Sequence, residues 1–191
     1  MPQPPLTILA ISGSLRSGSY NTAALRAAQE VAPEGVTIEI ASLAGLPLYD
    51  ADVQAAGFPP ETAGLGERVR AADAVLFAAP EYNYSMSGVL KNAIDWLSRL
   101  PDQPFAGKPI GMIGASMGLL GAVRAQYHLR QSLVFLDALP INKPEVFIAQ
   151  AHQKFDAEGH LTDDAVRGFI RAHVEALAAW ARRLKAAPPP A

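Results

Sequence analysis

Short apolar runs recur along the chain and alternate with stretches of helical period. Nearly continuous apolar segments occupy residues 6–11, 74–79 and 110–115, each bounded by Gly, Pro, Ser or Asp. Strands covered by helices on both faces have this composition, whereas half-exposed strands alternate apolar with polar residues. Weaker apolar segments at residues 36–40 and 146–149 complete a set of five expected strands.

The stretches between these strands predict helices. Residues 21–32 are rich in Ala, Leu and Arg, and residues 87–99 space apolar side chains by three and four, which gathers them on one helical face. The longest such stretch begins at Thr162, the expected N-cap, and keeps helical period through Phe169 to Leu184. Strands that alternate with helices in this way predict an α/β fold with a parallel, doubly wound sheet.

Composition narrows the class of protein. The length of 191 residues and an apolar share of 50% suit one well-buried core, so we expect a single domain over residues 1–191, with loose ends at 1–5 and 186–191. A net charge of −2 does not favour nucleic acid or an anionic membrane as partner. The chain has no cysteine, which excludes disulfides and thiolate chemistry, so redox chemistry would need a cofactor.

The first residues predict the location. Residues 1–5 hold no basic segment, and the apolar run that follows stops at Ser12, too soon for a signal peptide or a membrane span. We therefore expect a cytoplasmic protein.

The segment after the first strand is rich in hydrogen-bond donors. Residues 12–22 contain four serines, one threonine, two glycines and Arg16. The helix N-terminus that follows adds free N–H groups and partial positive charge, so the segment suits an anion such as a phosphate monoester. Its spacing matches neither the dinucleotide fingerprint nor the P-loop. An ordinary capped turn is the alternative, but a cation beside a helix N-terminus favours an intervening anion.

Two more polar segments follow later strands. Residues 80–88 hold two tyrosines and an asparagine that could form the wall of a site for a planar ring, although a polar loop leading to a helix capped by Ser87 is the simpler reading of this segment taken alone. Residues 116–118 form a third, glycine-containing loop. Parallel sheets bind ligands beyond the carboxyl ends of their strands. Three such loops therefore predict a ligand with both a ring and a phosphate, similar in shape to FMN.

With these segments in view, the sequence resembles the bacterial NADPH-dependent FMN reductase family, and within it the branch of chromate-reducing NAD(P)H:quinone reductases. The resemblance runs from Leu6 to about Glu145. It is carried by GSLRSGSYN at 13–21, LPLYDADVQ at 46–54, PEYNYS at 80–85, LKNAIDWLSR at 90–99, SMG at 116–118 and QYHLRQ at 126–131. It implies a flavodoxin-like three-layer sandwich whose five-stranded parallel sheet has the order 2-1-3-4-5, with helices on both faces.

The resemblance also implies an activity. Hydride would pass from NADPH or NADH through bound FMN to quinones and other small acceptors, namely chromate, azo compounds and free flavin, by a ping-pong mechanism. The flavin carries this chemistry, so we name no catalytic side chain, and we expect no metal. The implied cofactor-binding residues are Ser14, Leu15, Arg16, Ser17, Gly18, Ser19, Tyr20 and Asn21 around the phosphate, and Glu81, Tyr82, Asn83, Tyr84 and Ser116 around the ring.

Assembly is implied as well, because the family is typically dimeric. We expect a homodimer or a homotetramer, with Tyr84, Arg124, Tyr127 and Glu145 in polar contacts between dimers near the flavin. For Arg124, a salt bridge on a surface helix is the simpler alternative. Met86 stands where relatives often have Pro or Val, and we expect it to affect access to the ring rather than cofactor binding.

Two alternative functions remain open at this point. A flavodoxin-type electron carrier shares the fold and FMN but does not itself oxidise NAD(P)H. Such carriers are usually strongly acidic, and a net charge of −2 is a poor match. A flavin-free phosphate-binding domain is the other alternative. The four histidines show no metal-site spacing, and His173 is expected on the terminal helix.

Overall fold

The computed structural model describes residues 4–186 and contains a central parallel sheet. Four of its strands lie in the spatial order β2 (Val36–Ala41), β1 (Leu6–Ser12), β3 (Ala74–Ala78) and β6 (Pro109–Ala115). The fifth position is shared, because β7 (Leu139–Pro140) pairs with the start of β6 and β8 (Val146–Ile148) pairs with its end. The predicted order 2-1-3-4-5 is confirmed, with the fifth strand divided into two pieces.

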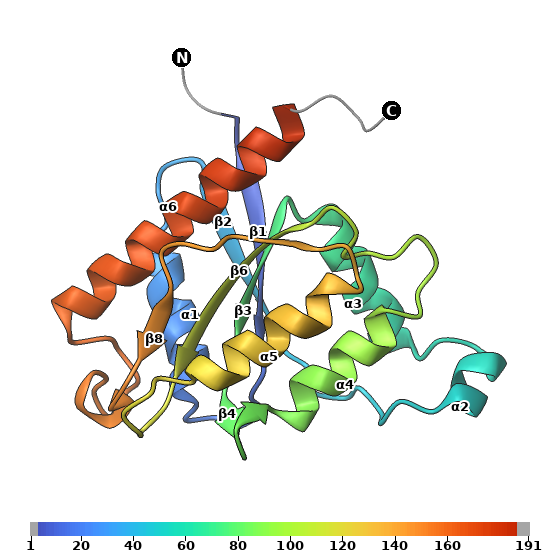
Figure 1. The fold of residues 1–191 in the computed structure, drawn as a ribbon, viewed down its shortest axis with the longest axis horizontal. Coiled ribbons are helices and arrows are strands. Elements are labelled where there is room, and N and C mark those ends of the chain that lie inside the picture. Colours follow the sequence, from blue (N-terminus) through green and yellow to red (C-terminus); the bar gives the residue numbers. More distant parts are fainter. Residues whose placement is uncertain (1–3, 187–191) are drawn as a thin grey trace.

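Helices cover both faces of this sheet, which confirms the predicted three-layer sandwich (Figure 1). One face carries α1 (Tyr20–Glu30) and α6 (Asp164–Ala186), and the other carries α3 (Pro60–Ala71), α4 (Gly88–Leu97) and α5 (Val123–Val134). Strand β1 shows how one strand serves two cores: Ile8 and Ala10 face α1 and α6, whereas Leu9 and Ile11 face the other helices. Burial on both faces explains the continuous apolar runs.

Helix α6 differs from its prediction at two residues. Asp163 rather than Thr162 caps it, because the Asp163 carboxylate accepts a hydrogen bond from the Val166 N–H at 2.9 Å. The Thr162 hydroxyl instead donates to the Lys154 carbonyl oxygen. Phe169, expected on the apolar face, is 59% exposed, because the buried face of the helix contains the neighbouring Ile170 instead.

Several elements, most of them short, escaped the sequence patterns. These are α2 (Ala51–Ala56), α3, α5, β7, the 3₁₀ turn η1 (Ala151–Gln153) and the hairpin of β4 (Glu81–Tyr82) and β5 (Ser85–Met86). Helix α3 contains two glycines, which are poor helix formers. At one of them, Gly66, a Cβ would lie 2.2 Å from Leu100 Cδ1, so a larger residue there would displace the Leu100 side chain. Strands of two residues are too short to show alternation.

The predicted loose ends lie mostly outside the described residues. Of the residues expected to be loose, 1–3 and 187–191 are not described, and Ala186 still belongs to α6. No helix within residues 4–186 is both long enough and apolar enough to cross a membrane.

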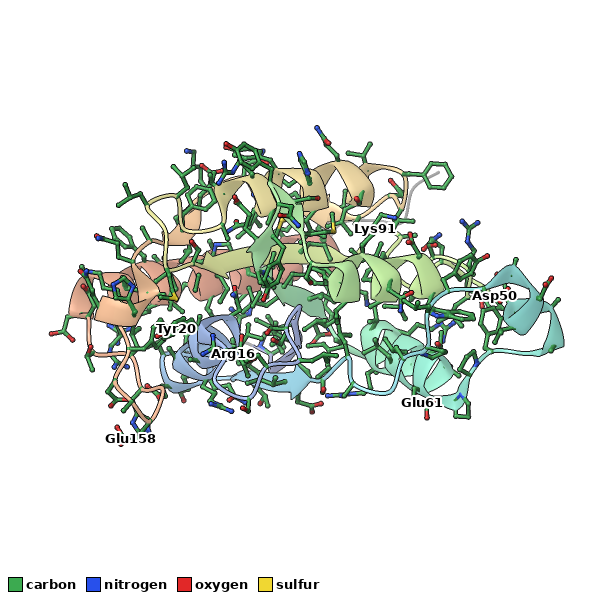
Figure 2. The ribbon with its side chains drawn as sticks, turned by 90° about the horizontal axis from the view of Figure 1, so that it is seen from below. Arg16, Tyr20, Asp50, Glu61, Lys91 and Glu158 are labelled. Carbon is green, nitrogen blue, oxygen red and sulfur yellow. The ribbon has the colours of Figure 1, made fainter. Side chains whose placement is uncertain are left out.

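Because every strand of the sheet runs in one direction, the carboxyl ends meet at one edge. Figure 2 looks onto the lower side of Figure 1, where the segments after β1, β3 and β6 emerge. Arg16 and Tyr20 lie between Glu158 at one end and Asp50 at the other, on the side of Glu158. Ligands of parallel sheets bind at such an edge.

Candidate active site

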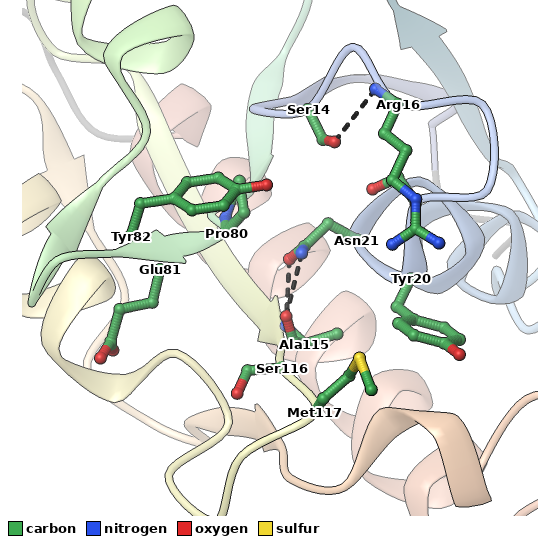
Figure 3. A pocket seen from close by; sticks show the side chains of 11 residues that line it. Ser14, Arg16, Tyr20, Asn21, Pro80, Glu81, Tyr82, Ala115, Ser116 and Met117 are labelled. Carbon is green, nitrogen blue, oxygen red and sulfur yellow. Dashed lines mark hydrogen bonds between the residues drawn. The ribbon is translucent and has the colours of Figure 1, made fainter.

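A cavity of about 240 Å³ opens between the three segments at this edge (Figure 3). Its lining residues are Ser14, Arg16, Ser19, Tyr20, Asn21, Pro80, Glu81, Tyr82, Ala115, Ser116 and Met117. Figure 3 shows Arg16 and Tyr20 on the side opposite Glu81 and Tyr82. The cavity therefore has two ends, which we call the Arg16 end and the hairpin end.

The prediction and the cavity wall agree for most residues. Five predicted site residues lie beside the wall instead of in it: Leu15, Ser17, Gly18, Asn83 and Tyr84. Of these, Ser17 and Gly18 line a neighbouring cavity that also includes Arg26 and Glu158. Three wall residues were missed, namely Pro80, Ala115 and Met117. Each directly precedes or follows a predicted site residue, and that adjacency was the signal that could have found them.

The Arg16 end is built from one continuous segment. Ser19 caps α1 and accepts a hydrogen bond from the Thr22 N–H, while the Ser14 hydroxyl accepts one from the Arg16 N–H at 3.3 Å. The first turn of α1 carries no acidic residue, and a helix start leaves N–H groups without intrahelical partners. No ion pair of Arg16 occurs among residues 4–186. The loop is thus a capped turn that also presents a cation and free N–H groups, so the two readings of the sequence do not exclude each other.

Gly13 lets this loop lie against the segment after β3. A Cβ at Gly13 would lie 2.8 Å from Pro80 Cδ and 3.1 Å from the Ala78 carbonyl oxygen. The Ser87 hydroxyl donates to the Gly13 carbonyl oxygen at 2.6 Å and accepts from the Leu90 N–H, so it caps α4 as predicted. One serine therefore joins two of the three segments.

Asn21 joins the third segment. Its side-chain amide donates to the Ala115 carbonyl oxygen and accepts from the Ala115 N–H, both at 3.0 Å, and the residue is buried (Figure 3). This pairing holds the end of β6, and with it Ser116, against the start of α1. The side chain is therefore committed to the fold, and what Asn21 offers a ligand is its backbone N–H.

The hairpin end is formed by β4 and β5. Tyr82 is 57% exposed, and its ring lies beside Pro80 at the cavity (Figure 3). Met86 points the other way, since it is buried in the core beneath α4 and α5 and does not line the cavity. We expected Met86 to affect access to the ring, and that expectation was wrong because alternation along β5 turns Met86 inward.

Glu81 reaches from the hairpin to α5. Its side chain, only 9% exposed, accepts hydrogen bonds from Arg124 Nε at 2.5 Å and from the Arg124 backbone N–H at 3.0 Å. The hydrogen bond to Glu81 also raises the pKa of Arg124. Because the Glu81 carboxylate is neutralised, the cation left at the cavity is Arg16. The wall of the cavity is thus positively charged at the Arg16 end, whereas at the hairpin end the charges of Glu81 and Arg124 offset each other.

Comparisons with known proteins agree with this geometry. The sequence profile of the NADPH-dependent FMN reductase family matches residues 6–153. The chain belongs to this family. It is 59% identical over 180 residues to an NAD(P)H-dependent FMN reductase of Pseudomonas aeruginosa, covering 94% of this chain and 97% of the relative. It is 46% identical over 183 residues to a quinone reductase of Escherichia coli, with the same two shares.

A solved structure also matches this member of the FMN reductase family. The flavoenzyme NAD(P)H:acceptor oxidoreductase FerB of Paracoccus denitrificans superposes with a TM-score of 0.84 and is 34% identical, covering 93% of this chain and 98% of that chain. Family membership confirms the resemblance that the sequence motifs indicated. The chain is therefore an FMN-dependent NAD(P)H oxidoreductase.

The residues expected between dimers lie near the hairpin of this FMN reductase family member. Within the chain, the Tyr127 hydroxyl donates to Glu145 Oε1 at 2.9 Å, and this bond raises the pKa of Tyr127. The Arg124 guanidinium lies over the Tyr84 ring. Among the described residues, no cluster of three His, Asp or Glu side chains could hold a metal ion.

Proposed function

We propose that this protein transfers hydride from NADPH or NADH, through FMN bound in the cavity at the carboxyl edge, to quinones and other small acceptors. The observation that carries the proposal is the two-ended cavity. A cation, serine hydroxyls and a helix start lie at one end, and an exposed tyrosine hairpin lies at the other. A phosphate monoester joined to a planar ring matches both ends at once.

The residues present fit FMN, and each end has a distinct task. When bound, FMN supplies the two-electron chemistry that links the nicotinamide to the acceptor. Arg16, the hydroxyls of Ser14 and Ser19 and the N–H groups at the start of α1 hold the phosphate. Pro80 and Tyr82 form a wall for the ring, and Ser116 offers a hydroxyl near it. The first turn of α1 and the wall at the Arg16 end contain no acidic residue, and Asp156 and Glu158 line the neighbouring cavity instead.

The rim of the cavity favours apolar, planar acceptors. Tyr82, Met117, Leu119 and Leu120 are exposed in the segments that border the cavity. Quinones, azo compounds and free flavin can be reduced on such a surface. Chromate is also proposed as an acceptor, but as an anion it meets no free cation at the hairpin end, because Arg124 is paired with Glu81.

The proposal is tested by titrating FMN into the apoprotein and following with an acceptor panel using both nicotinamides. Tight FMN binding with rapid oxidation of NADH or NADPH by quinones is the expected result. Tight binding without NAD(P)H oxidation would instead identify a flavodoxin-type carrier. No FMN binding at all would leave the flavin-free phosphate-binding domain.

We further propose a homodimer or homotetramer that acts in the cytoplasm, where its co-substrate NAD(P)H is made. Exposed Tyr84, Tyr127 and Phe135 on the hairpin and α5 support an interface there. In such an interface Tyr84, Arg124, Tyr127 and Glu145 would contact a second dimer. Light scattering of the purified protein gives the mass, and a monomer at micromolar concentration would contradict the assembly.

A further inference from the structure

The turn of the hairpin is strained at one residue. Asn83 and Tyr84 have positive φ values of 50° and 68° and connect β4 directly to β5. Two-residue hairpin turns with both φ values positive favour Asn followed by Gly. Asn83 follows this preference, whereas Tyr84 places a large side chain where glycine is favoured. The Tyr84 ring is 69% exposed, so burial does not compensate for this strain.

Arg124 contacts both parts of the hairpin. Its guanidinium carbon lies 3.6 Å from the centre of the Tyr84 ring, close enough for a cation–π interaction. The same guanidinium donates from Nε to Glu81 Oε1 at 2.5 Å. One side chain therefore fixes the strand that enters the turn and the residue at its tip.

The start of α5 depends on the hairpin in return. Its N-cap position is Ala122, which is left-handed and has no side chain able to accept a hydrogen bond. Glu81 takes that role from a distant segment, since its Oε2 accepts from the N–H groups of Arg124 at 3.0 Å and Ala125 at 3.4 Å. A carboxylate at a helix N-terminus is also favoured by the helix dipole. Hairpin and helix thus stabilise each other through Glu81 and Arg124.

We propose that Arg124 is a positioning residue of the cofactor site. By pairing with Glu81 and stacking on Tyr84, it holds Glu81 and Tyr82 in the geometry that receives the flavin ring. Arg124 and Tyr84 are not in the cavity wall, whereas Glu81 and Tyr82 are. The backbone strain at Tyr84 accompanies this arrangement, because a glycine at that position would relieve the strain but would remove the stacking on Arg124. This inference rests on FMN being the ligand of the cavity.

The test uses hydrogen exchange of the apoprotein together with FMN titration. Arg124→Ala is expected to speed amide exchange at residues 82–86 and in the first turn of α5 at least tenfold, and to weaken FMN binding about tenfold. Arg124→Lys keeps a charge for Glu81 but loses the planar stack, so intermediate values are expected. The matched control is Arg99→Ala, because Arg99 lies 5.6 Å from the Tyr49 ring centre and is not in the wall. It should change neither readout.

Tyr84→Gly separates positioning from folding. Glycine relieves the turn, so the unfolding midpoint should stay equal or rise, while FMN binding weakens severalfold. Tyr84→Phe keeps the stack on Arg124, so its affinity should lie closer to the wild type than that of Tyr84→Gly. Wild-type exchange and affinity in Arg124→Ala would overturn the proposal, as would a loss of affinity that appears only together with a change in oligomeric mass. If the wild-type protein binds no FMN, the proposed function fails, whereas unchanged exchange in apo Arg124→Ala refutes the positioning role by itself.

Discussion

The two ends of the cavity are built in different ways. The Arg16 end comes from a single stretch of chain, strand β1, its loop and helix α1, and the hydrogen bonds of Ser14 and Ser19 within it join residues two or three positions apart. The hairpin end consists of two-residue strands that are fixed by Arg124, forty-three residues after Glu81. The comparison shows that a loop rich in donors can be built mainly within one stretch of chain, whereas the geometry of a short hairpin can depend on a helix that is distant in sequence.

Only a few contacts connect the two ends. Ser87 joins the first loop to the segment after β3, and Asn21 joins α1 to the end of β6. A change at these connections, or in the sheet below, should affect both ends. A change within one end should leave the other intact.

Asn21→Ala should produce the largest effect, and it should affect both ends. Removing the amide leaves the buried N–H and carbonyl of Ala115 without partners, at about 1–3 kcal/mol each, so we expect a loss of about 2–4 kcal/mol in the free energy of unfolding. Urea denaturation of the apoprotein measures it. Gln29→Ala, which removes a single side-chain hydrogen bond to Ile38 at the far end of the same helix, is the matched control and should lose about 1 kcal/mol. Equal losses would contradict the bridging role.

Low pH should lower the free energy of unfolding of the whole protein, because His173 is buried in its neutral form. This buried side chain accepts from the Met112 N–H and contacts the Pro144 carbonyl oxygen, and burial lowers its pKa to about 4. The unfolded state therefore takes up a proton first as the pH falls below about 6.5. The contribution of neutral His173 to the free energy of unfolding is fully present above that pH. The free energy of unfolding falls by about 3 kcal/mol in total by about pH 4.

His173→Gln tests this effect, because glutamine keeps both kinds of hydrogen-bonding group but does not titrate. Its free energy of unfolding should vary less between pH 6.5 and 4 than that of the wild type. His152→Gln, a change at an exposed histidine, should keep the wild-type slope. If the hairpin exchanged its amides in acid well before global unfolding, the two ends would not share one scaffold.

Arg16→Ala should affect the Arg16 end alone. Loss of a charge-assisted contact to phosphate is expected to weaken FMN binding by about 1–3 kcal/mol, seen by fluorescence titration. Arg26→Ala, an exposed arginine of α1 outside this cavity, is the control. Amide exchange of the hairpin should stay at the wild-type rate in both variants. Unchanged FMN affinity in Arg16→Ala would refute the phosphate assignment.

Met117→Lys should give the smallest effect. A cation at the rim would attract chromate but not a neutral quinone, so the ratio of kcat/KM for chromate to that for a benzoquinone should rise about threefold to tenfold, or about 1 kcal/mol. The rise should shrink at high salt. A ratio that stays constant would mean that rim charge does not select the acceptor.

The sequence predicted the Arg16 end better than the hairpin end for a physical reason. Serines, glycines and Arg16 between a buried strand and a helix already specify a turn with donors, because the capping contacts of Ser14 and Ser19 are short-range. By contrast, two-residue strands leave no periodic pattern, and nothing near Tyr84 in sequence shows that Arg124 will lie over its ring. Met86 was misread because the direction of its side chain depends on the hairpin register.

The sequence alone was enough for the parallel sheet and the three segments at its carboxyl edge, which depend on hydrophobic periodicity, and for the family, which depends on local motifs; the strand order followed from the family resemblance. Only the tertiary structure decided that the Asn21 amide binds the backbone of Ala115, that Glu81 caps α5 and that His173 is buried against β6. The reason is that hydrogen-bond partners for buried polar groups are chosen in space, and residues far apart in the chain meet only after the sheet has brought them together.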